Sequence, residues 1–191
     1  IRSMRKVLQL LSIVVVGIAV ALMLISPELV LIFGSPKYRE AVYVIPPVAA
    51  SVFFIFIYNI LSMPQFYYEK TQFLMVASMA AAGANVVLNF IFIRLFGYIA
   101  AGYTTLACYM LYSVGHYIVS KRILVNEGIQ ENLMNPGFLL ACSVFLIGAS
   151  IICNLIFPYR LLRYAILLAS AGLVFWKKEL LLKTMADIRK K

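Results

Sequence analysis

The side chains that most often carry out enzyme chemistry are scarce in this chain. Asp187 is the only aspartate and His116 the only histidine among 191 residues. Paired aspartates that hold Mg²⁺ and the HExxH pattern that holds Zn²⁺ are both excluded. The sequence also contains no Walker A pattern. We predict that the chain is not an enzyme, binds no metal ion and uses no cofactor.

The acidic residues fall outside the long uncharged runs. They are assigned to loops or to the C-terminal tail: Glu28, Glu40, Glu69, Glu127, Glu131, Glu179 and Asp187. A proton or sodium relay through a membrane-spanning segment needs ionisable groups within it. The sequence therefore predicts no ion-coupling site. His116 lies about one turn before Lys121 and is predicted to sit near the headgroups rather than to handle protons.

Asparagine amides are the main candidates for a substrate site. Asn85 and Asn89 are spaced i,i+4, so they share one face of a helix, and the run Ala80–Ala84 before them is small enough for close helix approach. Asn59 lies in another apolar run. All three amides either bond neighbouring helices, which is the favoured interpretation, or line a hydrophilic cleft and bind sugar hydroxyls.

Three arginines are candidates for binding an anionic headgroup. Arg94, Arg160 and Arg163 each lie beside an apolar run and are predicted to cluster near the outer membrane face. They either anchor helix ends, which is favoured, or hold a phosphate by bidentate contacts. The three cysteines have no metal-type spacing and are interpreted as packing residues.

Composition indicates a membrane protein. The chain is 64% hydrophobic and 13% charged, against about 45–50% and about 25% in soluble domains. Its net charge of +10 comes from basic residues at the ends of apolar runs. Contacts with membrane lipids explain that placement better than nucleic acid does.

The uncharged runs predict an all-α, polytopic membrane protein with a six-helix transmembrane bundle over residues 1–176. About 20 helical residues cross a hydrocarbon core, which gives spans at about 7–25, 41–63, 71–93, 97–120, 138–157 and 160–176. Residues 177–191 are predicted to form a basic, amphipathic cytoplasmic tail.

Prolines, glycines and charges suggest where these spans end. Ser26–Glu40 is interpreted as a structured loop, with a short helix that could begin at Ser26 and Pro27. The second span is expected to bend near Pro46 and Pro47 and to end at Pro64. Only Arg94–Tyr98 separates spans three and four, which predicts a tight helical hairpin.

The distribution of basic residues predicts the orientation. Six spans place both termini on one side, with twelve of the 17 Lys and Arg residues, and leave five on the other. The positive-inside rule then puts both termini in the cytoplasm of a multi-pass protein of the cytoplasmic membrane.

Two stretches resemble polysaccharide flippases of the multidrug/oligosaccharidyl-lipid/polysaccharide exporter superfamily. The run Ser26-Pro-Glu-Leu-Val-Leu-Ile-Phe-Gly, with Lys37-Tyr-Arg-Glu-Ala41 after it, is similar to that family's loop between spans nine and ten. Asn85-Val-Val-Leu-Asn89, followed by Gly97-Tyr-Ile-Ala100-Ala-Gly-Tyr-Thr104-Thr, is similar to its N-x-x-x-N … G-x-x-G-A-A-x-A-T helix–turn–helix. Ala100 and Gly102 depart from that pattern. The resemblance covers roughly residues 1–125.

The resemblance implies the C-terminal half of a fourteen-helix transporter that flips lipid-linked oligosaccharides by alternating access. The expected partners are that substrate, the N-terminal half of the same transporter and membrane lipids. Half of a transporter is expected not to transport by itself. A drug or metabolite exporter of the same superfamily, or a non-transporting membrane scaffold, are the alternatives.

Overall fold

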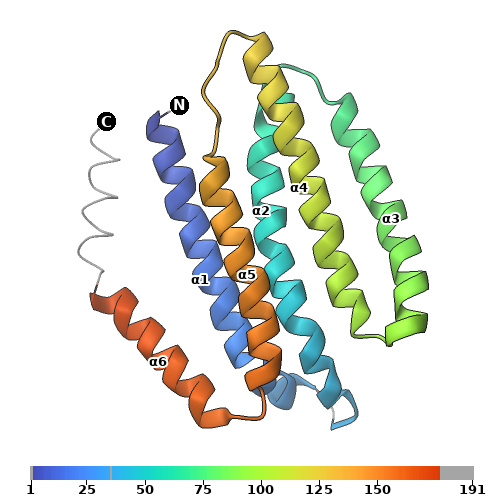
Figure 1. Cartoon of the computed structure of the whole chain (residues 1–191), viewed down its shortest axis with the longest axis vertical. Helices are drawn as coiled ribbons and strands as arrows, with labels where there is room; N and C mark the ends of the chain where they lie inside the picture. Colours follow the sequence, from blue (N-terminus) through green and yellow to red (C-terminus); the bar gives the residue numbers. More distant parts are fainter. Residues whose placement is uncertain (1, 35, 177–191) are drawn as a thin grey trace.

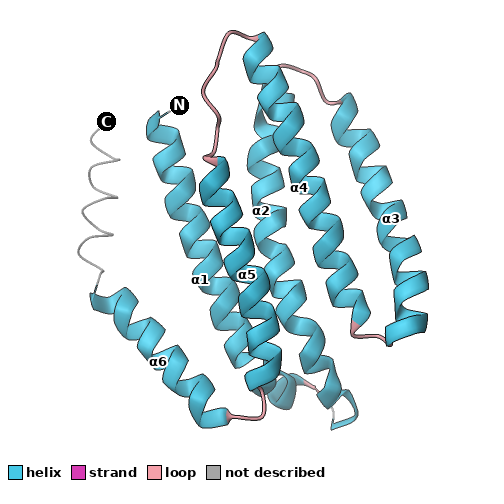
Figure 2. Ribbon diagram, viewed as in Figure 1, coloured by secondary structure: helices cyan, strands magenta, loops and turns pink. Residues whose placement is uncertain are grey.

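A computed structural model describes residues 2–34 and 36–176, and every regular element in them is helical (Figure 2). The prediction of an all-α chain with six α-helices is therefore confirmed. The elements are α1 (Arg2–Phe33), the 3₁₀ helix η1 (Pro36–Val44), α2 (Ile45–Tyr67), α3 (Gln72–Phe96), α4 (Ala100–Asn126), α5 (Pro136–Ile156) and α6 (Arg160–Trp176). The predicted tail, 177–191, lies outside the described residues.

Helix α2 lies at the centre of the arrangement. It packs most extensively on α4 and also contacts α1 and α5, whereas α3 lies at one edge and α6 at the other (Figure 1). The core is apolar, with Met23, Ala50, Phe53 and Leu146 almost completely buried. Successive α-helices run in opposite directions (Figure 1).

A glycine allows α4 to begin close to the start of α2. A Cβ added at Gly102 would lie 2.8 Å from Cγ of Pro47 and 3.0 Å from the carbonyl oxygen of Val44. Only a residue without a side chain fits that crossing without a shift. This contact gives a physical reason for the glycine at position 102, where the sequence departs from the flippase pattern.

The predicted hairpin between spans three and four is present. Helix α3 ends at Phe96, and α4 begins at Ala100. Gly97 adopts φ +78°, a conformation that favours glycine, and its N–H donates to the carbonyl of Ile93 at 2.9 Å.

Three expectations about prolines are wrong. Helix α1 continues through Pro27 to Phe33, so residues 26–33 of the predicted loop are α-helical. The last part of that predicted loop belongs to the 3₁₀ helix η1, which begins at Pro36. Pro27 cannot donate to the carbonyl of Met23, but the Ser26 hydroxyl donates to that oxygen at 2.8 Å. The bond lost at the proline is thereby replaced.

The prolines of α2 differ from expectation in a similar way. Pro46 and Pro47 occupy the first turn, where no intrahelical donor is needed, so they begin the helix instead of bending it. Pro64 lies inside α2, which ends three residues later at Tyr67.

Four helical segments in the described ranges are long and apolar enough to cross a membrane. They are Met4–Phe33, Arg39–Tyr67, Gln72–Phe96 and Pro136–Ile156. Helix α4 carries more polar residues, among them Thr104, Ser113 and His116, and α6 has 17 residues. That all six helices cross a bilayer stays a prediction.

Candidate functional site

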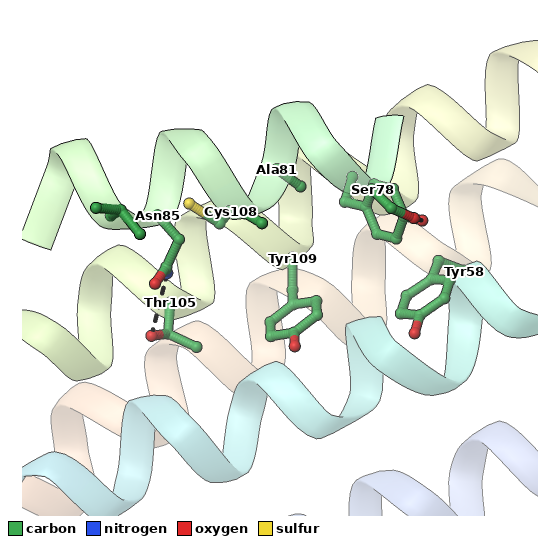
Figure 3. A pocket seen from close by; sticks show the side chains of 10 residues that line it. Tyr58, Ser78, Ala81, Asn85, Thr105, Cys108 and Tyr109 are labelled. Carbon is green, nitrogen blue, oxygen red and sulfur yellow. Dashed lines mark hydrogen bonds between the residues drawn. The ribbon is translucent and has the colours of Figure 1, made fainter. Parts of the chain in front are cut away.

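An open groove lies between α2, α3 and α4, at the middle of the α3 helix (Figure 3). Its volume is about 450 Å³, within the about 300–1,000 Å³ of small-molecule sites. No lining residue carries a formal charge. The lining consists of hydroxyl, amide and small apolar side chains: Tyr58, Ser78, Ala81, Ala82, Asn85, Val86, Thr105, Cys108, Tyr109 and Tyr112.

Asn85 and Asn89 join α3 to α4 at one end of the groove. The Asn89 amide donates to Oδ1 of Asn85 at 2.9 Å and accepts a hydrogen bond from the Thr104 hydroxyl. The Asn85 amide donates to Oγ1 of Thr105 at 3.4 Å (Figure 3). Both asparagines thus bond the neighbouring helix, and Asn85 also lines the groove.

Tyrosine rings and a serine form the other end. The Tyr58 ring of α2 stacks on Tyr109 of α4, with 6.3 Å between the centroids and 4° between the planes. Tyr58 also contacts Tyr112, whose hydroxyl lies 2.7 Å from that of Ser78. Hydroxyl groups and flat ring faces can together contact a polar, ring-shaped ligand.

Sequence patterns alone did not indicate these tyrosines or Ser78 as site residues. A signal was present, because Thr105, Tyr109 and Tyr112 are spaced i, i+4, i+7 and share one face of α4. The helices that contact this face of α4 could be identified only from the structure.

Asn59 lies outside the groove. Its side chain is exposed, and its amide donates to the carbonyl of Ile55 in its own helix at 2.7 Å. The structure therefore does not bring Asn59 together with Asn85 and Asn89.

The three candidate arginines do not form a cluster. Arg94 lies in the last turn of α3, with its guanidinium 3.9 Å from the centroid of the Phe90 ring. Helix α3 lies at the opposite edge of the bundle from α6, which carries the other two arginines (Figure 1). Arg160 is exposed at the start of α6. Arg163, one turn later, is 1% exposed.

Arg163 binds a carboxylate of the chain itself. Its Nη1 and Nη2 donate to the two carboxylate oxygens of Glu28, both at 2.8 Å, and Nη1 also donates to the carbonyl of Leu24. The Tyr164 hydroxyl donates to the same carboxylate at 2.9 Å. The expectation that Glu28 lies in a loop is wrong: it belongs to α1 and ties that helix to α6.

His116 is buried between α4, the last turn of α2 and the first turn of α3. Its Nδ1 lies 2.7 Å from Nε2 of Gln65, and both side chains are 0% exposed. His116 Nε2 and Gln65 Oε1 have no hydrogen-bond partner among the described residues. A buried pair with two unpaired polar atoms is uncommon in folded proteins.

In the described part of the chain, no three His, Cys, Asp or Glu side chains gather in a way that could hold a metal ion. Searches against models of protein families, curated proteins and solved structures found no significant match to this chain.

Proposed function

We propose that this chain forms one wall of a transmembrane passage through which a lipid-linked oligosaccharide is flipped across the cytoplasmic membrane. In this proposal all six helices cross the bilayer, both termini are cytoplasmic, and a second bundle of the same transporter closes the passage. The chain contributes binding surface and a movable wall but performs no covalent chemistry.

The uncharged polar groove between α2, α3 and α4 is the observation that carries the proposal. Its polar groups belong to the middle of the helices, from Ser78 to Asn85 on α3 and from Thr105 to Tyr112 on α4. Polar groups at that depth are costly in hydrocarbon unless they have partners or meet water. A passage for a polar headgroup gives them such an environment.

The chemistry of the lining suits the sugar part of the substrate. A sugar loses its hydrogen bonds to water when it enters hydrocarbon, which makes unassisted crossing very unfavourable. Asn85, Thr105 and Tyr112 offer both donors and acceptors to hydroxyl groups. Tyr109 and Tyr58 are half-buried and line the groove, so the accessible parts of their rings can pack on the apolar faces of sugar rings.

The packing of α3 would allow this helix to move as one wall of the groove. None of its side chains is buried, and its most extensive helix contact is with α4. Outward movement of α3 would widen the groove while the packing of α2 on α4 stayed intact.

Two adjacent valines allow a sharp test. Val86 lines the groove, whereas Val87 does not, and both are more than half exposed. The test uses the intact polypeptide with its native cysteines replaced. A hydrophilic thiol reagent should modify Val86→Cys at least about tenfold faster than Val87→Cys. The reason is that the thiolate is the reactive form, and a thiol in lipid does not ionise. Equal rates at the two positions would argue against a water-filled passage.

The same positions test transport. In a flippase-deficient cell, the intact transporter carrying Val86→Trp should restore much less surface polysaccharide than the one carrying Val87→Trp, because the indole fills the groove. Membrane levels of the two proteins serve as the control for folding. If Val86→Trp instead impaired efflux of a drug and left surface polysaccharide unchanged, the exporter alternative would replace this proposal. If neither tryptophan had an effect on polysaccharide or drug transport, the scaffold alternative would replace this proposal.

A further inference from the structure

His116 and Gln65 form a buried polar pair between α4 and α2 that the groove does not require. Neither residue lines the groove, and their shared hydrogen bond is 2.7 Å long. The helices could pack there with apolar side chains of similar volume, which would leave no unpaired polar atom. The pair therefore calls for an explanation beyond packing.

The hydrogen bond constrains the state of the imidazole. With Gln65 Nε2 as the donor, His116 Nδ1 must be the acceptor, so a neutral imidazole carries its proton on Nε2. That N–H and the Gln65 carbonyl oxygen are the two groups without partners. The assignment of oxygen and nitrogen in the Gln65 amide can be reversed by a half-turn.

This half-turn gives the pair a second state. If a proton from water adds to the lone pair of Nδ1, the new N–H donates to Oε1 of the rotated Gln65 amide. One hydrogen bond is present before the step and one after it, while the charge of the site rises by one unit. A glutamine can serve as either donor or acceptor in this way, whereas a lysine or a carboxylate cannot.

Aromatic rings surround the imidazole. The Tyr112 ring lies edge-on, with 4.5 Å between the centroids, while Phe73 of α3 lies at 5.3 Å and Tyr58 of α2 at 5.8 Å. These three rings and Gln65 thus enclose the imidazole.

The charged groups near this end of the helices are engaged elsewhere or exposed. Lys70 pairs with Glu127 at 3.0 Å, and Glu69 and Lys121 are exposed. The titratable side chains in ring contact with His116 are Tyr58 and Tyr112, while Phe73 and Gln65 do not titrate. Within the described residues, no ion pair involves His116.

We propose that His116 is a proton-binding site, with Gln65 as the partner that accepts the bond from the protonated imidazole. Tyr58 and Tyr112 both line the groove and contact His116, so these two rings link the site to the groove. The site goes beyond the proposed function and does not depend on the identity of the substrate.

The test follows the imidazole directly in the intact protein, without a histidine tag, in lipid nanodiscs. Nitrogen NMR of protein labelled at histidine reports the protonation of Nδ1 and Nε2, and the His116 signal is assigned by its loss in His116→Asn. We expect reversible protonation as the pH falls from about 6.5 to about 5, with the proton on Nε2 in the neutral form. An imidazole that stays neutral throughout this range in the unmutated protein overturns the proposal.

A variant pair tests the role of Gln65. Gln65→Leu removes the acceptor for the protonated form and should lower the charged fraction of His116 at a given acidic pH by about tenfold. The control is Asn59→Leu, which removes an amide of the same helix that does not bond to His116 and should leave the titration unchanged.

Gln65→Asn replaces Gln65→Leu if the latter does not fold, and the expected loss of the charged fraction is then smaller. An unchanged titration in the Gln65 variant overturns the assignment of the pair. Because proton binding is measured without transport, failure of this proposal and failure of the proposed function can be told apart.

Discussion

Helices α3 and α6 lie at opposite edges of the bundle and are attached in opposite ways. Helix α3 has no buried side chain and is joined to α4 by neutral hydrogen bonds that involve Asn85, Asn89 and Ser78. Among its described side chains, α6 buries only Arg163, which forms an ion pair with Glu28 of α1. Neither edge helix is held mainly by a buried apolar core.

This difference has a physical meaning if the chain lies in a bilayer as proposed. Lipid tails cover an exposed leucine as well as another helix does, so polar contacts and close packing decide how helices associate. Water or a hydroxyl-bearing ligand can replace the neutral bonds of α3 at little cost. Separating the ion pair of α6 leaves two charges without partners. We therefore expect α3 to move and α6 to stay attached to α1.

The largest effect is expected from breaking the ion pair. Arg163→Ala leaves the partly buried Glu28 carboxylate without its guanidinium, which should weaken the attachment of α6 by about 3 kcal/mol. Hydrogen exchange of the α6 backbone measures this, because a detached helix exchanges its amides faster. An increase of about 100-fold in exchange is expected.

Arg160→Ala is the matched control, because Arg160 lies one turn earlier on the same helix and is exposed. Its effect on exchange should be small. Exchanging the two charges, with Glu28→Arg and Arg163→Glu together, should recover part of the attachment. If Arg163→Ala behaved like Arg160→Ala, the ion pair would not be what holds α6.

A smaller effect is expected from loosening α3. Asn89→Leu removes the bond from Thr104 and the bond to Asn85. Of these two bonds only the one from Thr104 joins α3 to α4. Hydrogen bonds between helices in membranes average about 0.6 kcal/mol each, so the attachment of α3 should weaken by about 0.6 kcal/mol. The midpoint of unfolding in a denaturing detergent should fall accordingly. Asn59→Leu is the control, since Asn59 bonds only within its own helix.

The sequence predicted the helices well because uncharged runs of about 20 residues have few other stable structures. It misplaced helix ends at Pro27 and Pro64, and it predicted a bend at Pro46, where α2 begins. Proline was treated as a break, but Ser26 replaces the bond lost at Pro27, and the first turn of α2 needs no donor at Pro46. Such compensation depends on local geometry that a list of residues does not contain.

The candidate site was predicted only in part. The i,i+4 spacing of Asn85 and Asn89 correctly placed both amides toward a neighbouring helix, because helical periodicity fixes which side chains share a face. Glu28 and Arg163 are 135 residues apart, so their pairing depends on which helices meet. For the same reason, the position of Tyr58 opposite Tyr109 could not be inferred from spacing within one helix.

The smallest predicted effect concerns the small residues of α3, which were expected to allow close helix approach. Ala80, Ala82, Gly83 and Ala84 are exposed, and a Cβ added at Gly83 would meet no atom within 4 Å. Gly83→Ala should therefore stabilise the protein by about 0.5 kcal/mol, because alanine loses less backbone entropy in a helix than glycine does. The unfolding midpoint in denaturing detergent measures this gain.

The same substitution at Gly102 is the contrast, since the new methyl group would lie 2.8 Å from Pro47 Cγ in the crossing of α4 over the start of α2. Gly102→Ala should destabilise the protein because packed backbone and ring atoms would have to shift. Opposite signs at the two glycines would establish that α4 packs closely on α2 at Gly102 and that no helix packs on α3 at Gly83. Destabilisation by Gly83→Ala would mean instead that another helix packs closely on α3 at this position, and α3 would then not be the movable wall.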